Sequence, residues 1–263
     1  MVSHDSSSAA AGFTAVRESR ILRITLSNPG RKNAISYQTM VALGDTFRAL
    51  ADDPTVRVVL LTGEGGDFCT GADLAADTDG ITPEMTMDAA NRLVRAIVDA
   101  PVPVIARLRG AAAGIGVGIA LAADLVYAAD DSYLLLAFIN IGLMPDGGAA
   151  ALVAAAAGRA LANEMALLGK RLPATAAKDA GLLTAALPVD ELDGAVEAAV
   201  STIAAGPRRA LELTKKALNL ATLAALDEVL AAEKTGQVEL LDSADFREGA
   251  AAMLGKRKAV FSG

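Results

Sequence analysis

The chain has 263 residues, of which 53% are hydrophobic and only 3% aromatic, and its formal net charge is −7. This length suits one large domain with a smaller appendage, and the acidic balance argues against a nucleic-acid binder, which usually carries a basic surface. The single histidine is His4 and the single cysteine is Cys69. These counts argue against a Ser-His-Asp or Cys-His catalytic set and a zinc site, and they exclude a disulfide within the chain.

The N-terminal stretch is polar and lacks the basic and apolar regions of a signal peptide, so we expect a disordered tail over residues 1–12. An uncharged run between Arg109 and Asp124 is too short and too glycine-rich for a membrane span. We therefore expect a cytoplasmic protein that has neither membrane nor nucleic-acid partners.

Strand-like and helical patterns alternate through the first half of the chain. Strands are expected at 13–18, 21–27, 56–62, 103–108 and 124–129, and helices at 37–52 and 84–99. Ser36 is a suitable N-cap for the first of these helices. Repeated strand–strand–helix units predict an α/β fold with a parallel sheet.

From about residue 149 the strand signals fade and helical patterns dominate. Helices are expected at 149–157, 159–168, 175–181, 189–205, 207–220, 223–240 and 243–254, with a short strand at 183–188. Their charged residues are expected on solvated faces and at contacts between subunits. We divide the chain into a core over 13–205 and a C-terminal helical region over 206–263.

Two glycine-bracketed segments, 68–74 and 110–118, each follow a predicted strand and open a helix. Helix N-termini present unpaired N–H groups with partial positive charge, and glycines let a ligand approach them closely. Two such donors aimed at one point would form an oxyanion hole, which stabilises negative charge on a carbonyl oxygen. Residue types alone leave tight helix packing or a dinucleotide site open, although the GxGxxG order is not met.

Five stretches in order carry a resemblance to the crotonase superfamily, the enoyl-CoA hydratases and isomerases, over nearly the whole chain. They are 24–29 with 33–36, then 67–74, then 101–106 with Gly110, Gly114, Gly116 and Asp124, then 141–148, and finally 158–160. The resemblance implies a spiral of ββα repeats followed by a C-terminal helical trimerisation region. It also implies an enzyme of fatty acid metabolism that acts on acyl-CoA thioesters as a homotrimer or a dimer of trimers.

The resemblance further implies a set of substrate-binding residues. The N–H groups of Ala72 and Ile115, the latter following Gly114, would hold the thioester oxygen. The residues beside the CoA moiety would be Ala72, Asp73, Leu74 and Ala75, and those near its phosphates Arg31, Lys32 and, from a neighbouring subunit, Lys256 or Lys258. Solvated surface charge is the alternative for these cations. Because CoA would be part of the substrate, no cofactor and no metal is expected.

The sequence departs from the family at both acid–base positions. Hydratases of the family use two glutamates, and the matching positions here are Gly118 and Phe138. Adding water across a double bond needs a base for the water and an acid for the α-carbon, so ordinary hydratase activity is not expected.

One carboxylate remains near the expected site. Asp146 matches a position at which similar proteins carry the single base of a double-bond isomerase or the nucleophile of an aryl-CoA dehalogenase. The dehalogenases also use a histidine, and only His4 is available. The resemblance therefore implies isomerisation of an enoyl-CoA, with Ala72, Ile115 and Asp146 as the catalytic residues.

Several alternatives stay open. Pro-Asp-Gly is a common turn sequence, so Asp146 has a turn role as its alternative. The two missing glutamates also leave open an acyl-CoA-binding protein with a crotonase fold and little catalysis. A hydratase that uses Asp146 as its lone acid–base is a third alternative. If Asp146 is not the base, Asp77 or Asp79 is the alternative candidate for that role.

The remaining candidates are assigned structural or pocket roles. Asp73 is expected to fix its loop by local hydrogen bonds, and Cys69 is expected to be an inert thiol. The candidates for the wall of an apolar acyl pocket are Met85, Met87, Met144 and Phe138.

Overall fold

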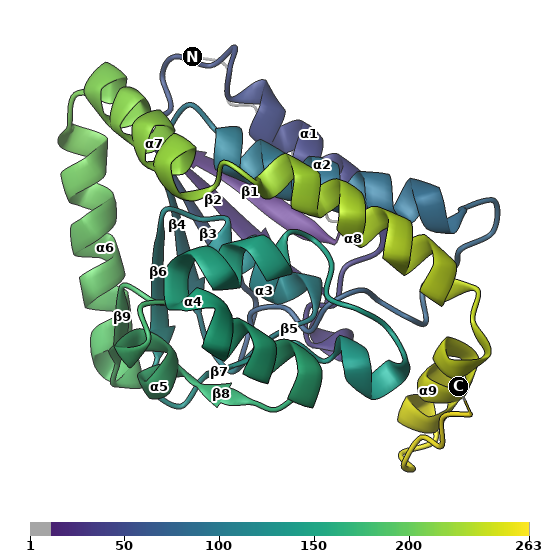
Figure 1. The fold of residues 1–263 in the computed structure, drawn as a ribbon. Helices are drawn as coiled ribbons and strands as arrows, with labels where there is room; N and C mark the ends of the chain where they lie inside the picture. Colours follow the sequence, from purple (N-terminus) through teal and green to yellow (C-terminus); the bar gives the residue numbers. More distant parts are fainter. Residues whose placement is uncertain (1–11, 263) are drawn as a thin grey trace.

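The structure is a computed structural model that describes residues 12–262, so the predicted tail lies outside the described residues apart from Gly12. The strands form a six-stranded sheet in the order β1-β2-β3-β4-β6-β9 and a three-stranded sheet in the order β5-β7-β8 (Figure 1). The strands are β1 (Phe13–Glu18), β2 (Ile21–Leu26), β3 (Val58–Gly63), β4 (Val104–Leu108), β5 (Ala111–Ala113), β6 (Leu125–Ala129), β7 (Tyr133–Leu135), β8 (Leu172–Pro173) and β9 (Ala185–Leu187). Only β1–β2 and β7–β8 pair antiparallel among these strands.

The helices follow the sequence pattern closely. They are α1 (Tyr37–Ala49), α2 (Pro83–Asp99), α3 (Ile115–Leu121), α4 (Ala149–Leu168), α5 (Ala174–Asp179), α6 (Val189–Ala205), α7 (Arg208–Thr222), α8 (Leu226–Leu241) and α9 (Ala244–Leu254), with 3₁₀ turns η2 (Pro29–Arg31) and η3 (Phe138–Ile141). Ser36 caps α1 as expected, because its side chain accepts a hydrogen bond from the Thr39 N–H. The predicted break between the helices at 149–157 and 159–168 is confirmed, because Gly158 has non-helical angles and interrupts α4.

Successive turns of the chain stack as a spiral. Each turn leaves one strand in the large sheet and one short extended segment beside it. These segments pair through a parallel bridge from Ile35 to Ala72, another from Cys69 to Ala112, and then through β5 and β7. The arrangement confirms the expected crotonase-like ββα spiral, and it brings the loops of consecutive turns side by side.

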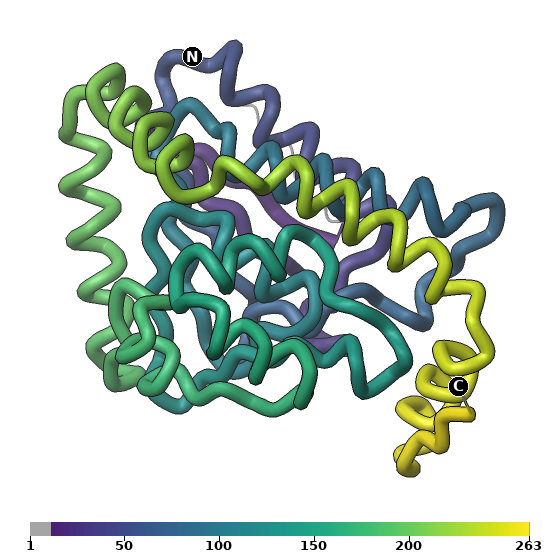
Figure 2. The backbone as a smooth tube through the Cα atoms, viewed as in Figure 1, coloured from purple at the N-terminus to yellow at the C-terminus, as the bar shows by residue number. Residues whose placement is uncertain are grey.

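The core lies between the large sheet and the helices that cover one face of it. Ile24, Leu61, Phe47 and Leu93 are fully buried there, and α1 packs along α2. The tube in Figure 2 shows the C-terminal part of the chain crossing back over the earlier turns, so that α8 lies along α2. The site described below is built where α8 meets these earlier turns.

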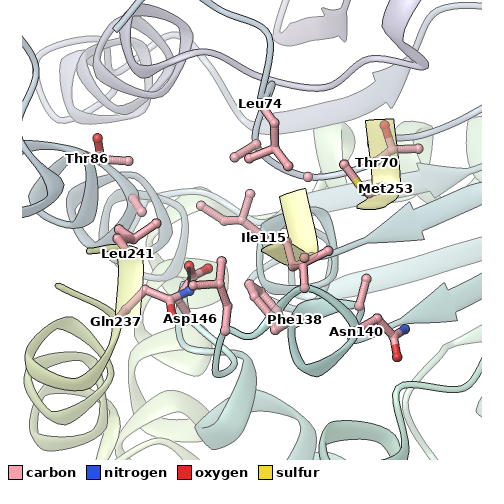
Figure 3. Close-up of a pocket in the computed structure, with 18 of the residues that line it drawn as sticks. Thr70, Leu74, Thr86, Ile115, Phe138, Asn140, Asp146, Gln237, Leu241 and Met253 are labelled. Carbon is pink, nitrogen blue, oxygen red and sulfur yellow. Dashed lines mark hydrogen bonds between the residues drawn. The ribbon is translucent and has the colours of Figure 1, made fainter. Parts of the chain in front are cut away.

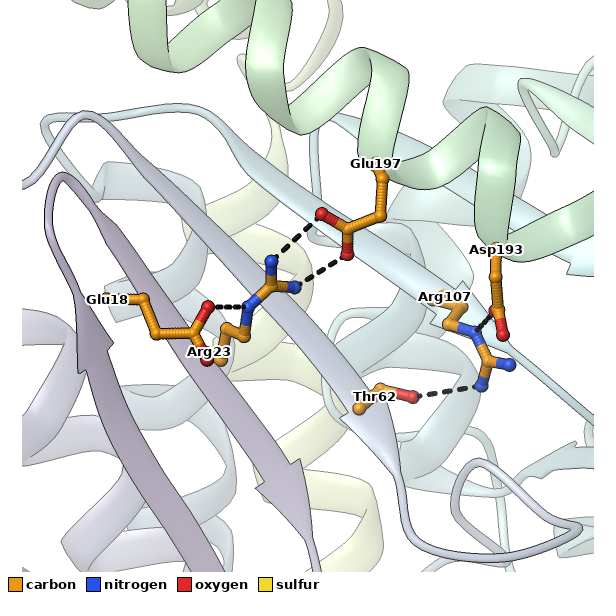
Figure 4. Close-up of polar contacts among 6 residues, drawn as sticks. All are labelled: Glu18, Arg23, Thr62, Arg107, Asp193 and Glu197. Atoms are coloured by element: carbon orange, nitrogen blue, oxygen red, sulfur yellow. Dashed lines mark hydrogen bonds and ion pairs between the residues drawn. The ribbon is translucent and has the colours of Figure 1, made fainter.

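Two arginines fasten α6 to the opposite face of the large sheet (Figure 4). Arg23 of β2 donates two hydrogen bonds to Glu197, at 2.7 and 2.9 Å, and another to Glu18. Arg107 of β4 donates to Asp193 of the same helix. A small apolar cluster beneath α6 completes this contact, which is remote from the cavity described below.

A buried ion pair holds α7 against the start of β4. The Asp124 Oδ2 accepts hydrogen bonds from the Val104 N–H at 2.7 Å and is 2.9 Å from the Lys215 Nζ. Burial raises the pKa of the Asp124 carboxyl and lowers the pKa of the Lys215 ammonium. The Asp124 motif thus has a structural role.

Lys215→Met is expected to lower the free energy of unfolding by about 1–3 kcal/mol, because it leaves the Ile97 and Val102 carbonyls without their buried donor and Asp124 without its ion-pair partner. The matched control is Lys234→Met, which removes the exposed pair with Asp88 and should cost less than about 1 kcal/mol. Urea denaturation of both variants measures the difference. Equal losses would mean that the buried pair contributes no more than a surface pair.

Helix α4 is long and apolar enough to cross a membrane by length and composition alone. Its first turns nevertheless pack into the core through Ala149, Leu152 and Val153, and Gly158 interrupts the helix with φ 76° and ψ 169°. Only 17% of its apolar window is buried within the chain. The exposed remainder is an apolar surface without a covering element among residues 12–262.

Candidate active site

A cavity of ≈ 420 Å³ lies where both glycine-bracketed segments meet η3, α8 and α9. Its wall includes Ala72, Leu74, Ile115, Phe138 and Asp146, all predicted from the sequence, and most of its other side chains are apolar (Figure 3). The spiral therefore brings together residues that are far apart along the chain. This cavity is the candidate active site.

In the first segment, residues 68–74, the N–H group of Ala72 points away from the hydrogen bonds made by the adjoining residues. The Ile35 N–H donates to the Gly71 carbonyl, and the Asp73 N–H donates to the Ile35 carbonyl, both at 2.9 Å. Because direction alternates along an extended chain, the N–H of Ala72, between these two, faces the opposite side. It donates no hydrogen bond within residues 12–262, and Ala72 lines the cavity.

The second segment presents the N-terminus of α3. Gly114 is the N-cap, with φ 55°, and its own N–H donates to the Leu135 carbonyl at 3.0 Å. Ile115 is the first residue of the helix, and the N–H groups of a first turn have no acceptor within the helix. The Ile115 N–H is therefore a free donor at the cavity wall.

The two donors lie on backbones that touch. A Cβ atom added to Gly114 would lie 3.4 Å from the Gly71 Cα, and one added to Gly71 would lie 3.3 Å from the Ala113 carbonyl oxygen. Both glycines have positive φ, at 105° for Gly71 and 55° for Gly114. Side chains would force these segments apart, so the glycines permit the close pair of N–H groups that an oxyanion hole requires.

Asp146 sits in a tight turn whose carboxylate reaches the cavity. Gly147 and Gly148, with φ of 63° and 74°, turn the chain directly after it. The Oδ2 atom accepts a hydrogen bond from the Gln237 Nε2 at 2.7 Å, while Oδ1 is buried without a partner in the described part of the chain. Burial raises the pKa of the Asp146 carboxyl to about 6, although the Gln237 hydrogen bond lowers it. Asp146 therefore belongs to the predicted turn and also lines the cavity, so these two alternatives do not exclude each other.

Two buried polar residues of α8 hold this turn, and the sequence analysis missed them. Glu233 accepts hydrogen bonds from the Gly148 N–H at 2.7 Å and the Ala150 N–H at 3.0 Å. Gln237 accepts from the Met144 N–H at 3.2 Å. Burial raises the pKa of the Glu233 carboxyl to about 7.

The expectation that charged residues of the C-terminal helices lie on solvated faces is wrong for Glu233, which is 1% exposed. The available signal was the spacing of Glu233 and Gln237, which places both on one face of α8 together with the buried Leu230. That face packs onto the turn that carries Asp146.

The two altered acid–base positions differ in what occupies them. A Cβ atom on Gly118 would lie 2.4 Å from the carbonyl oxygen of Gly147, so the turn after Asp146 fills the space of a side chain at this position. Phe138 is buried and forms part of the apolar wall. The site thus has no carboxylate at either position.

Local structure accounts for two further predictions. The Asp73 Oδ1 accepts a hydrogen bond from the Ala75 N–H at 3.0 Å, and its Oδ2 lies 3.4 Å from the Asn28 Nδ2. This confirms that Asp73 fixes its loop. Cys69 is completely buried, which raises the pKa of its thiol to about 12 and supports the prediction of an inert thiol.

Other predicted residues lie outside the cavity wall. Met87 lines it, but Met85 and Met144 do not, so those two pocket assignments are wrong. Met85 is exposed, and the Met144 side chain points toward Gly236 of α8. Asp77 and Asp79 are exposed and also lie outside the wall. No group of His, Cys, Asp or Glu within residues 12–262 is arranged to hold a metal.

The cations assigned to the CoA phosphates are exposed residues around the site. Lys32 is 65% exposed and lies 3.4 Å from Asp67, and the carbonyl groups of Arg31 and Lys32 both accept from the Thr70 hydroxyl. Lys256 follows α9 and does not line the cavity, but its neighbour Arg257 does. The roles of Arg31, Lys32 and Lys256 stay predictions.

Known proteins resemble this chain over nearly its full length. A family model described as enoyl-CoA hydratase/isomerase matches residues 16–263. A 1,2-epoxyphenylacetyl-CoA isomerase of Escherichia coli K12 is 36% identical, with 94% of this chain and 96% of that protein covered. A 2,3-dehydroadipyl-CoA hydratase of the same organism is 32% identical, over 94% and 97%.

A solved structure supports the same relationship. The crystal structure of an enoyl-CoA hydratase from Mycobacterium avium subsp. paratuberculosis K-10 is 42% identical and superposes with a TM-score of 0.91, covering 96% of this chain and 99% of that one. The relatives include both isomerases and hydratases by name. The chain belongs to the enoyl-CoA hydratase/isomerase family, whose enzymes act on acyl-CoA thioesters.

Proposed function

We propose that this enzyme is an enoyl-CoA isomerase that moves a double bond from position 3 to position 2 of the acyl chain. The observation that carries the proposal is the pairing of one buried carboxylate, Asp146, with two free N–H donors in one cavity. Gly118 and Phe138 leave no second carboxylate for the addition of water. The relative named 1,2-epoxyphenylacetyl-CoA isomerase supports an isomerisation on a CoA thioester, although its named substrate is an epoxide.

The reaction requires one proton to be removed and returned. Asp146 takes a proton from C2, and the C–H electron pair enters the conjugated system to give a dienolate. Its negative charge moves to the thioester oxygen, which accepts hydrogen bonds from Ala72 and Ile115. Protonated Asp146 then delivers the proton to C4, so atoms and electrons balance without a cofactor.

The pKa of Asp146 suits both steps. A carboxyl with a pKa of about 6 is ionised at neutral pH and can accept the proton. It is also a stronger base than an ordinary aspartate, because burial makes its charge unfavourable. Each oxyanion donor of this kind contributes about 2.7–4 kcal/mol to transition-state stabilisation.

The cavity suits an uncharged acyl chain. Met40, Met87, Phe138 and Leu241 are among its apolar side chains. Among residues 12–262, Arg257 is the one cation in the lining, and Glu248 engages it through two hydrogen bonds. A terminal carboxylate on the acyl chain would find no free cation among these lining residues.

The CoA moiety is proposed to follow the first segment out of the cavity. Residues 72–75 lead from the first donor to the surface, where Ala75 is exposed. Arg31 and Lys32 lie next to the same segment through Thr70. These exposed cations would meet the phosphates, with Lys256 supplied by another subunit.

The protein is proposed to form a homotrimer or a dimer of trimers. The uncovered apolar surface of α4 includes Leu167 and Leu168, which are 67% and 52% exposed, and Leu218 and Leu220 of α7 are also exposed. Contact with other copies would bury such surfaces. Light scattering should give about three or six times the chain mass of 26.7 kDa; the mass of a single chain would contradict the proposal.

An absorbance assay with 3-hexenoyl-CoA tests the reaction. Growth of the conjugated enoyl-thioester band with time is expected for the isomerase. Formation of 3-hydroxyhexanoyl-CoA from 2-hexenoyl-CoA at a comparable rate would instead identify a hydratase. Tight binding of both esters without turnover would identify an acyl-CoA-binding protein and overturn the proposed isomerase.

A further inference from the structure

We propose that Gln237 is a positioning residue that gives the two oxygens of Asp146 different tasks. Oδ2 is held by the Gln237 amide, and Oδ1 is the atom that removes and returns the proton. This inference rests on the proposed function and adds to it the identity of the base atom and of the residue that orients it. Figure 3 shows the Gln237 amide beside the Asp146 carboxylate.

The orientation of the Gln237 amide follows from its two partners. A backbone N–H can only donate, so the amide atom 3.2 Å from the Met144 N–H must be the oxygen, Oε1. The nitrogen, Nε2, then faces Asp146 and donates to Oδ2 at 2.7 Å. Gln237 is 1% exposed, so both contacts are shielded from bulk solvent.

The unpartnered Oδ1 atom points to the same division of tasks. A buried carboxylate oxygen without a hydrogen bond is costly, because it has lost its contact with water. Oδ1 has no partner among the described residues, and Asp146 lines the cavity. Oδ1 has less than 1 Å² of accessible surface in this structure, so substrate binding must first expose it to the cavity. Its free lone pairs can then meet a substrate C–H group, while Oδ2 stays fixed by Gln237.

Helix α8 supplies both the residue that orients Asp146 and a second buried carboxyl group, Glu233, on the same turn. Glu233, one turn before Gln237, fixes the following part of the turn through Gly148 and Ala150, and its charge and that of Asp146 disfavour each other. Ile115 of α3 and Phe138 of η3 face the same cavity with apolar side chains. The protonation of Asp146 is therefore controlled by burial, which raises its pKa, and by the Gln237 donor, which lowers it.

The test compares pH profiles of wild type and Gln237→Glu. In the wild type, kcat/KM should fall as the pH drops through about 6, because protonated Asp146 cannot accept a proton. Gln237→Glu keeps an acceptor for Met144 but replaces the donor to Asp146 by a carboxylate. Like charges raise a carboxyl pKa, so this limb should move up by at least about one pH unit. The rate should then fall by at least about twofold at pH 7 and by nearly tenfold at pH 5.

Further readouts separate positioning from a structural role. KM should change less than kcat, and the deficit of Gln237→Glu should shrink as the pH rises. The control, Asn91→Leu, removes the hydrogen bond from Asn91 of α2 to the Leu230 carbonyl of α8. It should lower the melting temperature and leave the acid limb in place. Gln237→Glu with a lower melting temperature but the wild-type profile would overturn the inference.

The inference can fail separately from the proposed function. Infrared difference spectra over pH report the protonated carboxyl of Asp146 without turnover, with Asp146→Asn as the reference that lacks it. An unchanged midpoint in Gln237→Glu would overturn the inference whatever the reaction. If instead Asp146→Asn isomerises 3-hexenoyl-CoA at the wild-type rate, the proposed function fails, and the infrared midpoint still decides the role of Gln237.

Discussion

Asp146→Asn is expected to lower the rate of 3-hexenoyl-CoA isomerisation by about 100- to 10,000-fold, the range typical of losing a general base. The amide that replaces the carboxylate has nearly the same shape but cannot accept a proton from C2. The Ala72 and Ile115 donors belong to other segments, so KM should stay within a few fold of the wild-type value. Steady-state kinetics at pH 8 measure both quantities, and a near wild-type kcat would exclude Asp146 as the base.

The same variant should be more stable than the wild type above pH 6, which serves as the control for folding. Between its ordinary value of 3.8 and about 6, the unfolded chain releases the Asp146 proton while the native protein retains it. Raising the pH through this window therefore favours unfolding. Removing the charge should restore on the order of 3 kcal/mol at pH 8. Denaturant unfolding at pH 8 and pH 4 checks this, since the gain should nearly vanish at pH 4.

Gly118→Glu is expected to lower the isomerase rate by about 100-fold without creating a hydratase, because small displacements of a reacting group carry penalties of this size. The Cβ atom alone would lie 2.4 Å from the Gly147 carbonyl oxygen. No rotamer of the glutamate relieves that contact, so the turn that carries Asp146 must move. Adding Phe138→Glu to restore both carboxylates should not rescue hydration.

Product analysis with 2-hexenoyl-CoA and 3-hexenoyl-CoA tests this expectation. Gly194→Ala in α6 is the matched control, because no atom lies within 4 Å of an added Cβ there, and it should leave activity and folding unchanged. Formation of 3-hydroxyhexanoyl-CoA by the double variant would contradict this expectation. It would show that the turn at Gly147 moves aside for the new side chain without loss of function. The expected result would mean that a carboxylate at position 118 and the observed Asp146 turn exclude each other in this backbone.

The elements that sequence predicted well are those with strong local patterns. The strand at 13–18 and the helix at 189–205 match β1 and α6 residue for residue, because alternation and helical spacing depend on neighbours along the chain. The second sheet was missed. Its strand β5 consists of Ala111–Ala113, residues that favour helices, and it exists because β7 and the Cys69 segment pair with it.

The candidate site divides in the same way. The sequence predicted the two glycine segments, the turn at Asp146 and the missing glutamates at Gly118 and Phe138. Each of these features depends only on which residues stand at a few neighbouring positions. The apolar wall was only partly predicted. Met85 and Met144 are apolar, as pocket residues usually are, but their side chains lie outside the cavity wall. Periodicity cannot tell which of several apolar side chains a cavity will contact.

By itself, the sequence determined the family, the order of the main helices and of the strands of the large sheet, and the absence of the glutamates that hydratases use. Only the tertiary structure decided the pKa and the hydrogen bonding of Asp146. Its burial, its pKa of about 6 and its hydrogen bond to Gln237, 91 residues away, depend on α8 packing across the earlier turns. A pKa is set by the desolvation and charges around a group, and for Asp146 those surroundings come from distant parts of the chain.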